Sequence, residues 1–436
     1  MKKTITKMLL TLIIIGAAQL SKSQNYVKNV IVLNEGHYDY VNQIQTVPVT
    51  IGSYDPVSKI YSTFDTIPNA RFASCIVIDS NYMYAAADSF LIKYDRFSHA
   101  KLNTQIVQGI RRIAVWHNQL LITRGQYMVS YNSYFQAYDK NSLSFIYELD
   151  SNTGPQYSTE GIVVNNDTAY LAVNNGFDFG NEVGFIGKVN LNSQSYAANI
   201  NLGVTGKNPF NIATNGSVIY TVNNEDFSTA SVTAMDISSG SLNTVGLASS
   251  SGCGASILIT DFIYYQVSGN VVLKRFSTST LSNYDTLQIN ENIYGIADDN
   301  VNSLIYAGET DYLTWGKIFI YNHTGIVQDS FNVSVSPGNI AMDIRSSAGI
   351  NQITTDAKVS VYPNPTHDFV TINYIGINSN ENITCEIIDV LGNAIETIKE
   401  TPNTVRNISL QNLSSGIYSL KVTSDKAITM TKLVKE

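Results

Sequence analysis

Asn339-Ile340-Ala341-Met342-Asp343 is the segment on which the predicted fold depends most. Its pattern predicts a strand. The strand comes after the last of a series of repeated units and belongs to none of them. At the other end of the series, the first unit begins directly at Val30-Ile-Val-Leu33 and lacks an innermost strand. We predict that the surplus strand pairs beside Val30 to Leu33, because joining the first and last units in one sheet removes exposed strand edges. An open β-solenoid is the alternative.

A residue pair at the end of a strand, usually an aromatic residue followed by Asp or Asn, marks each unit. Seven such pairs occur: Tyr54-Asp55, Tyr94-Asp95, Tyr138-Asp139, Val189-Asn190, Met235-Asp236, Arg275-Phe276 and Tyr321-Asn322. Their first residues are 40, 44, 51, 46, 40 and 46 positions apart, a period typical of propeller blades. A polar turn follows each pair. The sequence therefore predicts an all-β fold, with a seven-bladed β-propeller over residues 24–345.

A second run of strands follows a polar, poorly patterned linker over residues 346–357. It covers residues 358–436, which is too short for two further blades. Several short strands in about 80 residues are typical of a small sandwich. We therefore predict a C-terminal Ig-like β-sandwich.

Four motifs stand in this second run: Tyr362-Pro-Asn-Pro-Thr366, Asp389-Val-Leu-Gly-Asn393, Leu413-Ser-Ser-Gly-Ile-Tyr-Ser-Leu-Lys421 and Lys432-Leu-Val-Lys435. They closely resemble, in the same order, the type A C-terminal sorting domain of the type IX secretion system. The sorting-motif residues are Tyr362, Pro363, Asn364, Pro365, Gly392, Gly416, Tyr418 and Lys432. The resemblance implies that the type IX secretion machinery is a partner and that the protein is secreted or held at the cell surface. An ordinary interaction sandwich is the alternative.

The N-terminus has the features of a cleaved export signal. Lys2 and Lys3 precede an apolar run from Met8 to Ala18, and Ser21-Lys22-Ser23 fits a cleavage site. We predict a signal peptide over residues 1–23. A membrane anchor is the alternative, although the run is too short to span comfortably. No later segment approaches a spanning length, so the mature chain is expected to have no transmembrane segment.

Charge and cysteine content exclude several classes of function. The net charge of −8 becomes −12 without residues 1–23, and an acidic chain is a poor partner for nucleic acid. Cys75, Cys253 and Cys385 are odd in number and widely spaced, which gives neither a disulfide framework nor a zinc pattern. The five His residues show no metal-ligand spacing either, so no metal and no cofactor is predicted.

The repeats resemble a known group as well. Val32-Leu-Asn-Glu-Gly36 and the recurring Tyr-Asp strand ends are similar to YncE-like, surface-layer-type propellers. Some members of that group capture cobalamin for an outer-membrane transporter. The resemblance implies a ligand-binding propeller, with an accessory role in outer-membrane nutrient uptake as one specific form.

Ligands of propellers usually bind over the central channel, on the face that carries the second-to-third loops and the loops entering the innermost strands. Polar and aromatic residues in these loops are therefore candidates for ligand binding. They are Asn34, Glu35, His37, Arg71, Arg111, Arg112, Arg124, Tyr127, Glu160, Asn174, Asn175, Phe177, Asn223, Asn224, Glu225 and Tyr294. Asn in such loops is often a turn residue for local reasons alone. The adjacent Arg111 and Arg112 favour an anionic neighbour, which is either a ligand or Glu160 of the next repeat.

Three classes of function remain open. The first is a non-enzymatic surface module that binds a small molecule, a glycan or a partner protein. The second is a secreted lyase or hydrolase using rim carboxylates such as Glu35 and Glu160 together with His37. The third is a structural or adhesive surface protein. No nucleophile-elbow or dinucleotide-binding motif occurs in the sequence.

Overall fold

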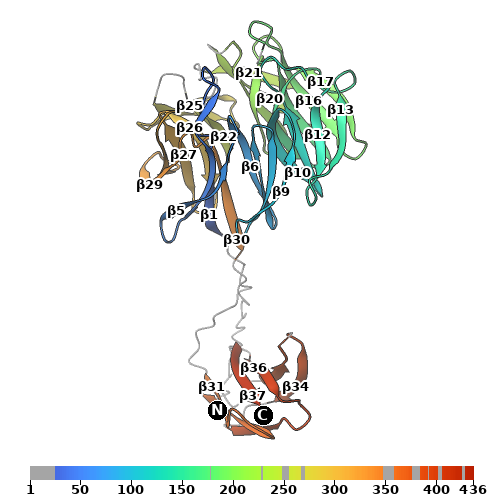
Figure 1. Ribbon diagram of the computed structural model, residues 1–436, viewed down its shortest axis with the longest axis vertical. Helices are drawn as coiled ribbons and strands as arrows, with labels where there is room; N and C mark the ends of the chain where they lie inside the picture. The colour runs from blue at the N-terminus through green and yellow to red at the C-terminus, as the bar shows by residue number, and fades with distance from the viewer. Residues whose placement is uncertain are drawn as a thin grey trace, which may run out of the picture. The chain divides into compact units, whose positions relative to one another are not determined.

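The computed structural model describes residues 25–176, 178–226, 229–247, 255–266, 271–346, 358–375, 383–390, 392–400, 405–424 and 428–436. The predicted signal peptide and residues 347–357 of the predicted linker lie outside them. The chain divides into two compact units, one over residues 25–347 and one that contains the described residues from 358 to 436. Figure 1 shows both units, which consist of strands.

Seven four-stranded antiparallel sheets account for the described strands of the first unit, apart from a small hairpin of β2 (His37–Asp39) and β3 (Ile44–Val47). From the inner strand outward, the first three sheets are β30 (Asn339–Ser346), β1 (Asn25–Asn34), β4 (Val49–Asp55), β5 (Ile60–Ile67); β6 (Ala73–Asp79), β7 (Tyr82–Ala87), β8 (Phe90–Asp95), β9 (Lys101–Ile106); and β10 (Ile110–Trp116), β11 (Gln119–Arg124), β12 (Ser133–Asp139), β13 (Phe145–Asp150).

The other four sheets keep the same strand order. They are β14 (Thr159–Asn165), β15 (Thr168–Asn174), β16 (Gly184–Asn190), β17 (Ser195–Asn201); β18 (Pro209–Thr214), β19 (Val218–Asn223), β20 (Ala230–Asp236), β21 (Leu242–Leu247); β22 (Ser256–Ile259), β23 (Phe262–Gln266), β24 (Val272–Ser277), β25 (Ser282–Gln288); and β26 (Ile293–Asp299), β27 (Leu304–Thr310), β28 (Gly316–Asn322), β29 (Val327–Val333). Repeated four-stranded sheets of this kind are consistent with a propeller.

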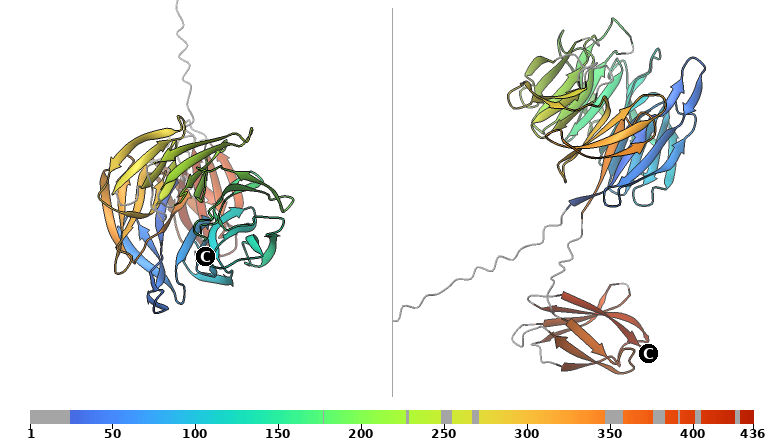
Figure 2. Two further views of the ribbon diagram at one scale, coloured as in Figure 1. Left: turned by 90° about the horizontal axis from the view of Figure 1, so that it is seen from above. Right: turned by 90° about the vertical axis from the view of Figure 1, so that its left-hand side faces the viewer.

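The predicted pairing of the surplus strand is confirmed. Strand β30 lies antiparallel to β1, with Val30 opposite Met342 and Leu33 opposite Asn339. Each inner strand contacts the inner strand of the next sheet, and β30 contacts both β6 and β26. The inner-strand contacts therefore form a complete circuit, in which the blue and orange sheets from opposite ends of the unit meet (Figures 1 and 2).

The second strands of the sheets are buried on both faces, and strand β1 shows why. Side chains alternate between the two faces of a strand, so Ile31 and Leu33 pack against the sheet that begins with β6. Val30 and Val32 point the other way and pack with Tyr306 and the rest of the β26 sheet. Apolar clusters of this kind fill each of the seven boundaries between neighbouring sheets. Strand β1, which pairs with β30, is thus packed on both faces against neighbouring sheets.

The residue pairs that mark the repeats combine a core residue with a turn cap. Tyr138 is buried, and the carboxylate of Asp139 accepts hydrogen bonds from the backbone N–H groups of Asn141 (2.9 Å) and Ser142 (2.8 Å). The turn ends at Leu143, whose φ is 59°. Asp supports such turns because its side chain hydrogen-bonds the backbone two or three residues on.

One predicted mark was wrong by one position. Phe276, rather than Arg275, is the buried residue that corresponds to the Tyr of the other marks, because it pairs with Ile263 as Tyr138 pairs with Leu120. The next residue, Ser277, supplies the cap through its hydroxyl, which accepts a hydrogen bond from the backbone N–H of Thr280 at 3.3 Å. Ser replaces Asp in this turn, so the sequence pattern is hard to recognise there.

The second unit is a β-sandwich of two sheets. One sheet has the order β31 (Lys358–Tyr362), β32 (Phe369–Ile375), β35 (Val405–Ser409), and the other β34 (Ala394–Glu400), β33 (Ile383–Ile388), β36 (Gly416–Ser424), β37 (Ile428–Lys435). Their inner faces share a single apolar cluster that includes Val370 and Ile408 from the first sheet and Cys385 and Leu420 from the second. Within the described chain, no helix is long and apolar enough to cross a membrane.

Candidate functional site

A cavity of about 280 Å³ lies where the inner strands begin, and we call it the mouth cavity. Its lining comes from the starts of six inner strands (β6, β10, β18, β22, β26 and β30) and from Glu35, which follows β1. The polar and aromatic side chains in this lining include Glu35, Phe72, Ser74, Arg111, Arg112, Phe210, Asn211, Ser256, Tyr294 and Asn339. Residues far apart in the sequence thus meet at the mouth of the channel.

Backbone irregularities at the starts of the inner strands place several of these side chains. The pairing register shifts between Ala73 and Cys75, Ile110 and Ile113, Thr159 and Ile162, Pro209 and Asn211, and Ile293 and Gly295. A bulge of this kind leaves extra residues unpaired and redirects their side chains. The residues inside the shifts include Ser74, Arg111, Arg112, Glu160, Phe210 and Tyr294.

Arg111 forms a buried ion pair with Glu160 of the next sheet. Its Nε lies 2.7 Å from Glu160 Oε1, and the Glu160 side chain is 3% exposed. Burial alone would lower the pKa of Arg111, but the charge and hydrogen bond of Glu160, together with the charges of Glu35 and Tyr294, outweigh it and raise that pKa above its usual value. Arg111 therefore remains charged and is already neutralised by Glu160.

Arg112 points into the same cavity with a different set of neighbours. Its Nη1 donates to the backbone oxygen of Ser74 and, at 3.2 Å, to that of Arg111. The guanidinium also lies 5.7 Å from the centre of the Phe210 ring. Within the described part of the chain, no carboxylate oxygen lies within 4.0 Å of this guanidinium. Arg112 is thus a fixed cation whose charge is not cancelled by a direct ion pair.

Glu35 is the second acid near the mouth cavity, and Tyr294 donates its hydroxyl to Glu35 Oε2. The loop that carries Glu35 is tied to the chain before β30, because Glu35 N–H donates to Ser336 O at 2.8 Å. Burial raises the pKa of the Glu35 carboxyl. The hydrogen bond from Tyr294 and the attraction of the two arginines lower it, but burial has the larger effect.

The loop after β1 requires a glycine next to Glu35. Gly36 has a φ of 73°, and a Cβ at this position would lie 2.3 Å from the backbone oxygen of Val47. Its N–H donates to Val335 O at 3.0 Å. Gly36 thus allows the close approach of three segments that holds Glu35 over the cavity.

Three predicted amide side chains are buried and form hydrogen bonds within the first unit. They do not line the mouth cavity. Asn34 Nδ2 donates to Thr50 Oγ1 at 3.1 Å and to Tyr61 Oη at 3.0 Å. The Asn174 amide donates to Pro209 O (2.9 Å), and that of Asn223 donates to Ser231 Oγ (2.9 Å) and Thr233 Oγ1 (3.0 Å). These amides connect the ends of second strands to neighbouring segments.

Arg71 and Arg124 are likewise held by protein groups. Arg71 forms two hydrogen bonds with the carboxylate of Asp88, at 2.6 and 2.7 Å. Arg124 donates to Gln108 O at 2.9 Å and to Ser133 O at 2.7 Å. Its guanidinium also lies 4.2 Å from the ring centre of Tyr131. The lining of the mouth cavity includes neither side chain.

None of the remaining predicted residues that the structure describes lines the mouth cavity. His37 lies on the β2–β3 hairpin with its Nδ1 2.6 Å from Thr46 Oγ1, Tyr127 is exposed, and Asn175 donates to Asp178 Oδ2 at 3.3 Å. Glu225 accepts a hydrogen bond from Thr229 Oγ1 at 2.7 Å, while Asn224 is buried. Phe177 lies outside the described residues.

Several residues of the mouth cavity are not among those predicted from the sequence. These are Phe72, Ser74, Asn211, Ser256 and Asn339. Their position along the chain could have identified them, because each lies at or just before the start of an innermost strand. Within the described chain, no group of three or more His, Cys, Asp or Glu side chains is placed to hold a metal ion.

The sorting motifs of the second unit meet around its last strand. Asn364 donates from Nδ2 to Lys432 O at 2.6 Å and accepts from Val434 N–H at 2.9 Å. Pro363 and Pro365 on either side of it both follow cis peptide bonds. Residues about 70 positions apart are thus held together.

The two sorting motifs that contain glycine form turns. Gly392 has a φ of 89°, and Asp389 accepts a hydrogen bond from Asn393 N–H at 2.8 Å. Near Gly416, the hydroxyl of Tyr418 donates to Ser414 O at 2.8 Å. These contacts give a structural reason for each motif.

Residues 360–436 match a family described as the secretion system C-terminal sorting domain. The C-terminal unit is a type IX secretion sorting domain. Such a domain implies interaction with the type IX secretion machinery and secretion across the outer membrane, to the cell surface or the exterior.

Other comparisons concern the chain more broadly. No curated protein matches the sequence. Among solved structures, the extracellular domain of BT4673 from B. thetaiotaomicron aligns with 95% of this chain at 12% identity and a TM-score of 0.48. This chain spans 60% of the length of that structure. A form of KlHsv2 with loop 6CD replaced by a Gly-Ser linker aligns with 77% of this chain and 98% of its own, at 9% identity and a TM-score of 0.43.

Proposed function

We propose that residues 24–345 form one closed seven-bladed propeller, displayed outside the outer membrane, whose mouth cavity binds a small organic anion without catalysis. In this proposal residues 1–23 direct export from the cytoplasm and residues 358–436 direct export across the outer membrane. Residues 346–357 connect the two domains. The sorting domain and the circuit of inner-strand contacts support this organisation.

Arg112 is the observation that carries the proposed ligand class. Its guanidinium is fixed at the cavity by two backbone oxygens, so little side-chain freedom is lost when a ligand binds. Arg matches carboxylate and phosphate groups through paired hydrogen bonds. The ring of Phe210 beside it offers an apolar contact for the rest of the ligand.

The arrangement of the acids favours binding over acid–base catalysis. Glu160 is engaged by Arg111, and His37 is not part of the described lining of the mouth cavity. Of the two carboxylates and His37 that a lyase or hydrolase of the predicted kind requires, the described lining of the mouth cavity contains Glu35 alone.

A narrower form of the proposal makes the protein an accessory to outer-membrane nutrient uptake, with cobalamin as one ligand. Calorimetric titration of the purified protein with cobalamins tests this form separately. Heat that saturates at one ligand per chain supports it, whereas no heat above background removes cobalamin from the proposal.

The main proposal is tested by calorimetric titration of the mature full-length protein with a panel of carboxylates and phosphate monoesters. We expect at least one to bind, and Arg112→Ala to weaken its binding roughly 10- to 100-fold, the value of a charge-assisted hydrogen bond. Arg112→Lys should recover part of the loss, because Lys keeps the charge without the planar fork.

Lys101→Ala is the matched control. It removes one positive charge from the ion pair with Asp65 on an outer strand, away from the mouth cavity, and should leave affinity unchanged. Equal affinities of the wild type and Arg112→Ala for every ligand that binds would contradict the proposal.

A further inference from the structure

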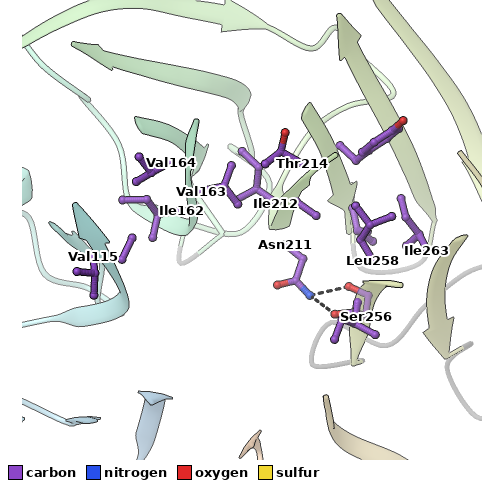
Figure 3. Close-up of a pocket in the computed structure, with 15 residues that line it drawn as sticks. Val115, Ile162, Val163, Val164, Asn211, Ile212, Thr214, Ser256, Leu258 and Ile263 are labelled. Carbon is purple, nitrogen blue, oxygen red and sulfur yellow. Dashed lines mark hydrogen bonds between the residues drawn. The ribbon is translucent and has the colours of Figure 1, made fainter. Parts of the chain in front are cut away.

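A second cavity adjoins the mouth cavity and has a different character. We call it the channel cavity. Its volume is about 510 Å³, and its lining comes from β10, β14, β18 and β22 and from the second strands β19 and β23. The side chains in it include Val115, Ile162, Val163, Val164, Ile212, Leu258 and Ile263, several of which are seen around the open space in Figure 3. This surface is predominantly aliphatic.

Asn211 and Ser256 connect the two cavities, because both residues line both of them. The amide of Asn211 donates to Ser256 O at 2.9 Å and to Ser256 Oγ at 2.6 Å, as the dashed lines in Figure 3 show. This pair marks the border between the polar mouth and the aliphatic channel. A single ligand that passes this border would meet a cation at one end and an apolar wall at the other.

The sizes of the two cavities suit such a ligand. Small-molecule sites commonly measure about 300–1,000 Å³ and combine an apolar lining with a few fixed polar groups. The channel cavity alone falls within this range. The adjoining mouth cavity supplies the fixed polar group, which is Arg112. Its guanidinium can orient an anionic head in the mouth while the apolar portion of the ligand enters the channel cavity.

We propose that the protein binds amphipathic organic anions, with the anionic head at Arg112 in the mouth cavity and the apolar portion in the channel cavity. This inference rests on the proposed function and specifies its ligand class. Affinity should grow with the length of the apolar portion, because each methylene group moved from water to an apolar site strengthens binding about fourfold.

Calorimetric titration of the mature full-length protein with straight-chain carboxylates from acetate to decanoate, below their micelle concentrations, provides the test. We expect affinity to rise about fourfold per added methylene until the channel cavity is full. Octanol, which has the apolar chain without the charge, should bind at least tenfold more weakly than octanoate.

Variants test the contributions of the anionic head and the apolar portion of the ligand separately. Arg112→Ala should weaken all the carboxylates by a similar factor, so the dependence on chain length remains. Ala114→Leu, which fills part of the channel cavity, should reduce the dependence on chain length. Because added bulk can impair folding, Val163→Thr provides a second variant of nearly equal shape, which should also reduce it. Lys101→Ala should leave the whole series unchanged.

The possible failures are distinguishable. If acetate and decanoate bind the wild type equally and both need Arg112, the amphipathic class is wrong and the proposed anion site stands. If decanoate and octanol bind alike and Arg112→Ala has no effect, the anionic head is wrong and the proposed function fails with it. If no carboxylate binds, the amphipathic class is wrong, and the proposed anion site fails as well only if no phosphate monoester of the panel binds.

Discussion

Glu35 is a carboxyl group on which burial and hydrogen bonding act in opposite directions. Burial raises its pKa above the usual value, more than Tyr294, Arg111 and Arg112 lower it. A raised pKa means that the folded protein holds this proton more tightly than the unfolded chain does. The contribution of Glu35 to stability is therefore largest at low pH and is lost as pH rises through the raised pKa.

The same titration should control anion binding at the mouth cavity. As pH falls through the raised pKa, Glu35 loses its negative charge and the positive charge of Arg112 is less opposed. We expect the affinity for an alkyl sulfonate, whose own charge is constant, to increase as pH falls. In Glu35→Gln the affinity should be high at neutral pH and nearly independent of pH. A pH dependence that persists in Glu35→Gln would assign the effect to another group.

Arg124 is a buried arginine whose role is structural in this geometry. It links Gln108 O and Ser133 O and stacks on Tyr131. Arg124→Ala leaves two carbonyl oxygens without this donor and should lower the free energy of unfolding by about 2–4 kcal/mol. Denaturant unfolding measures this, with Lys101→Ala as the exposed control, expected below about 1 kcal/mol. An equal effect of the two variants would refute this role.

At the scale of an element, the turn between the third and fourth strands of each sheet is stabilised in the same way, by a side-chain oxygen that accepts hydrogen bonds from backbone N–H groups. In the β12–β13 turn, the Asp139 carboxylate accepts from two backbone N–H groups, and these bonds lower the pKa of Asp139. Asp139→Ala should cost about 1 kcal/mol of stability at neutral pH. Asp139→Asn should cost less, because Asn retains an acceptor oxygen.

Measuring the free energy of unfolding across pH shows whether the stabilising effect of Asp139 depends on its charge. Because the pKa of Asp139 is lowered by folding, its contribution is present above the unfolded-state pKa and is lost as pH falls through the folded-state value. The difference in unfolding free energy between wild type and Asp139→Asn should therefore shrink in acid. A difference that is constant with pH would show that the charge plays no part.

The cavities are also a property of elements, because they depend on where the inner strands depart from regular pairing. A regular strand alternates its side chains between two faces, so two adjacent residues cannot both face the channel. The register shift between Ile110 and Ile113 relaxes this restriction at Arg111 and Arg112. The sequence shows which residue types stand at these starts, but bulges have no strong local signature there.

At the scale of the whole molecule, closure depends on β30. A chain that ends after Ser346 retains this strand and should unfold cooperatively. A chain that ends before Asn339 exposes the edge of β1 and opens the apolar cluster that Val30 and Val32 share with the β26 sheet. We expect the shorter chain to unfold at a much lower temperature or to aggregate. Circular dichroism and gel filtration would show this, and identical melting of the two chains would contradict it.

Export is the second property of the whole chain. Deletion of residues 360–436, which match the sorting family, should leave the protein in the periplasm and absent from the cell surface and the medium. Immunoblots of fractionated cells would measure this distribution. Asn364→Ala, which removes the contacts to Lys432 and Val434, should reduce export to a lesser degree. Normal surface delivery of the deleted chain would show that another segment carries the signal.

The repeats, the polar turns, the surplus strand and the sorting motifs could all be predicted from local sequence. Each of these depends on short-range chemistry, namely alternation along a strand, a turn of a few polar residues, or a motif of a few letters. For the same reason the Tyr-Asp pattern failed by one residue only where Ser277 replaces the carboxylate.

Which of the candidate residues lie together at one cavity depends on long-range packing. The Arg111–Glu160 pair joins residues 49 positions apart, and the hydrogen bond from Tyr294 to Glu35 spans 259. Such distances along the chain are closed by the packing of whole sheets, which no local pattern encodes. Packing places Glu160 beside Arg111 and places Arg112 beside a cavity. Asn34 and Arg124 instead form hydrogen bonds inside the protein, because buried polar groups are nearly always paired.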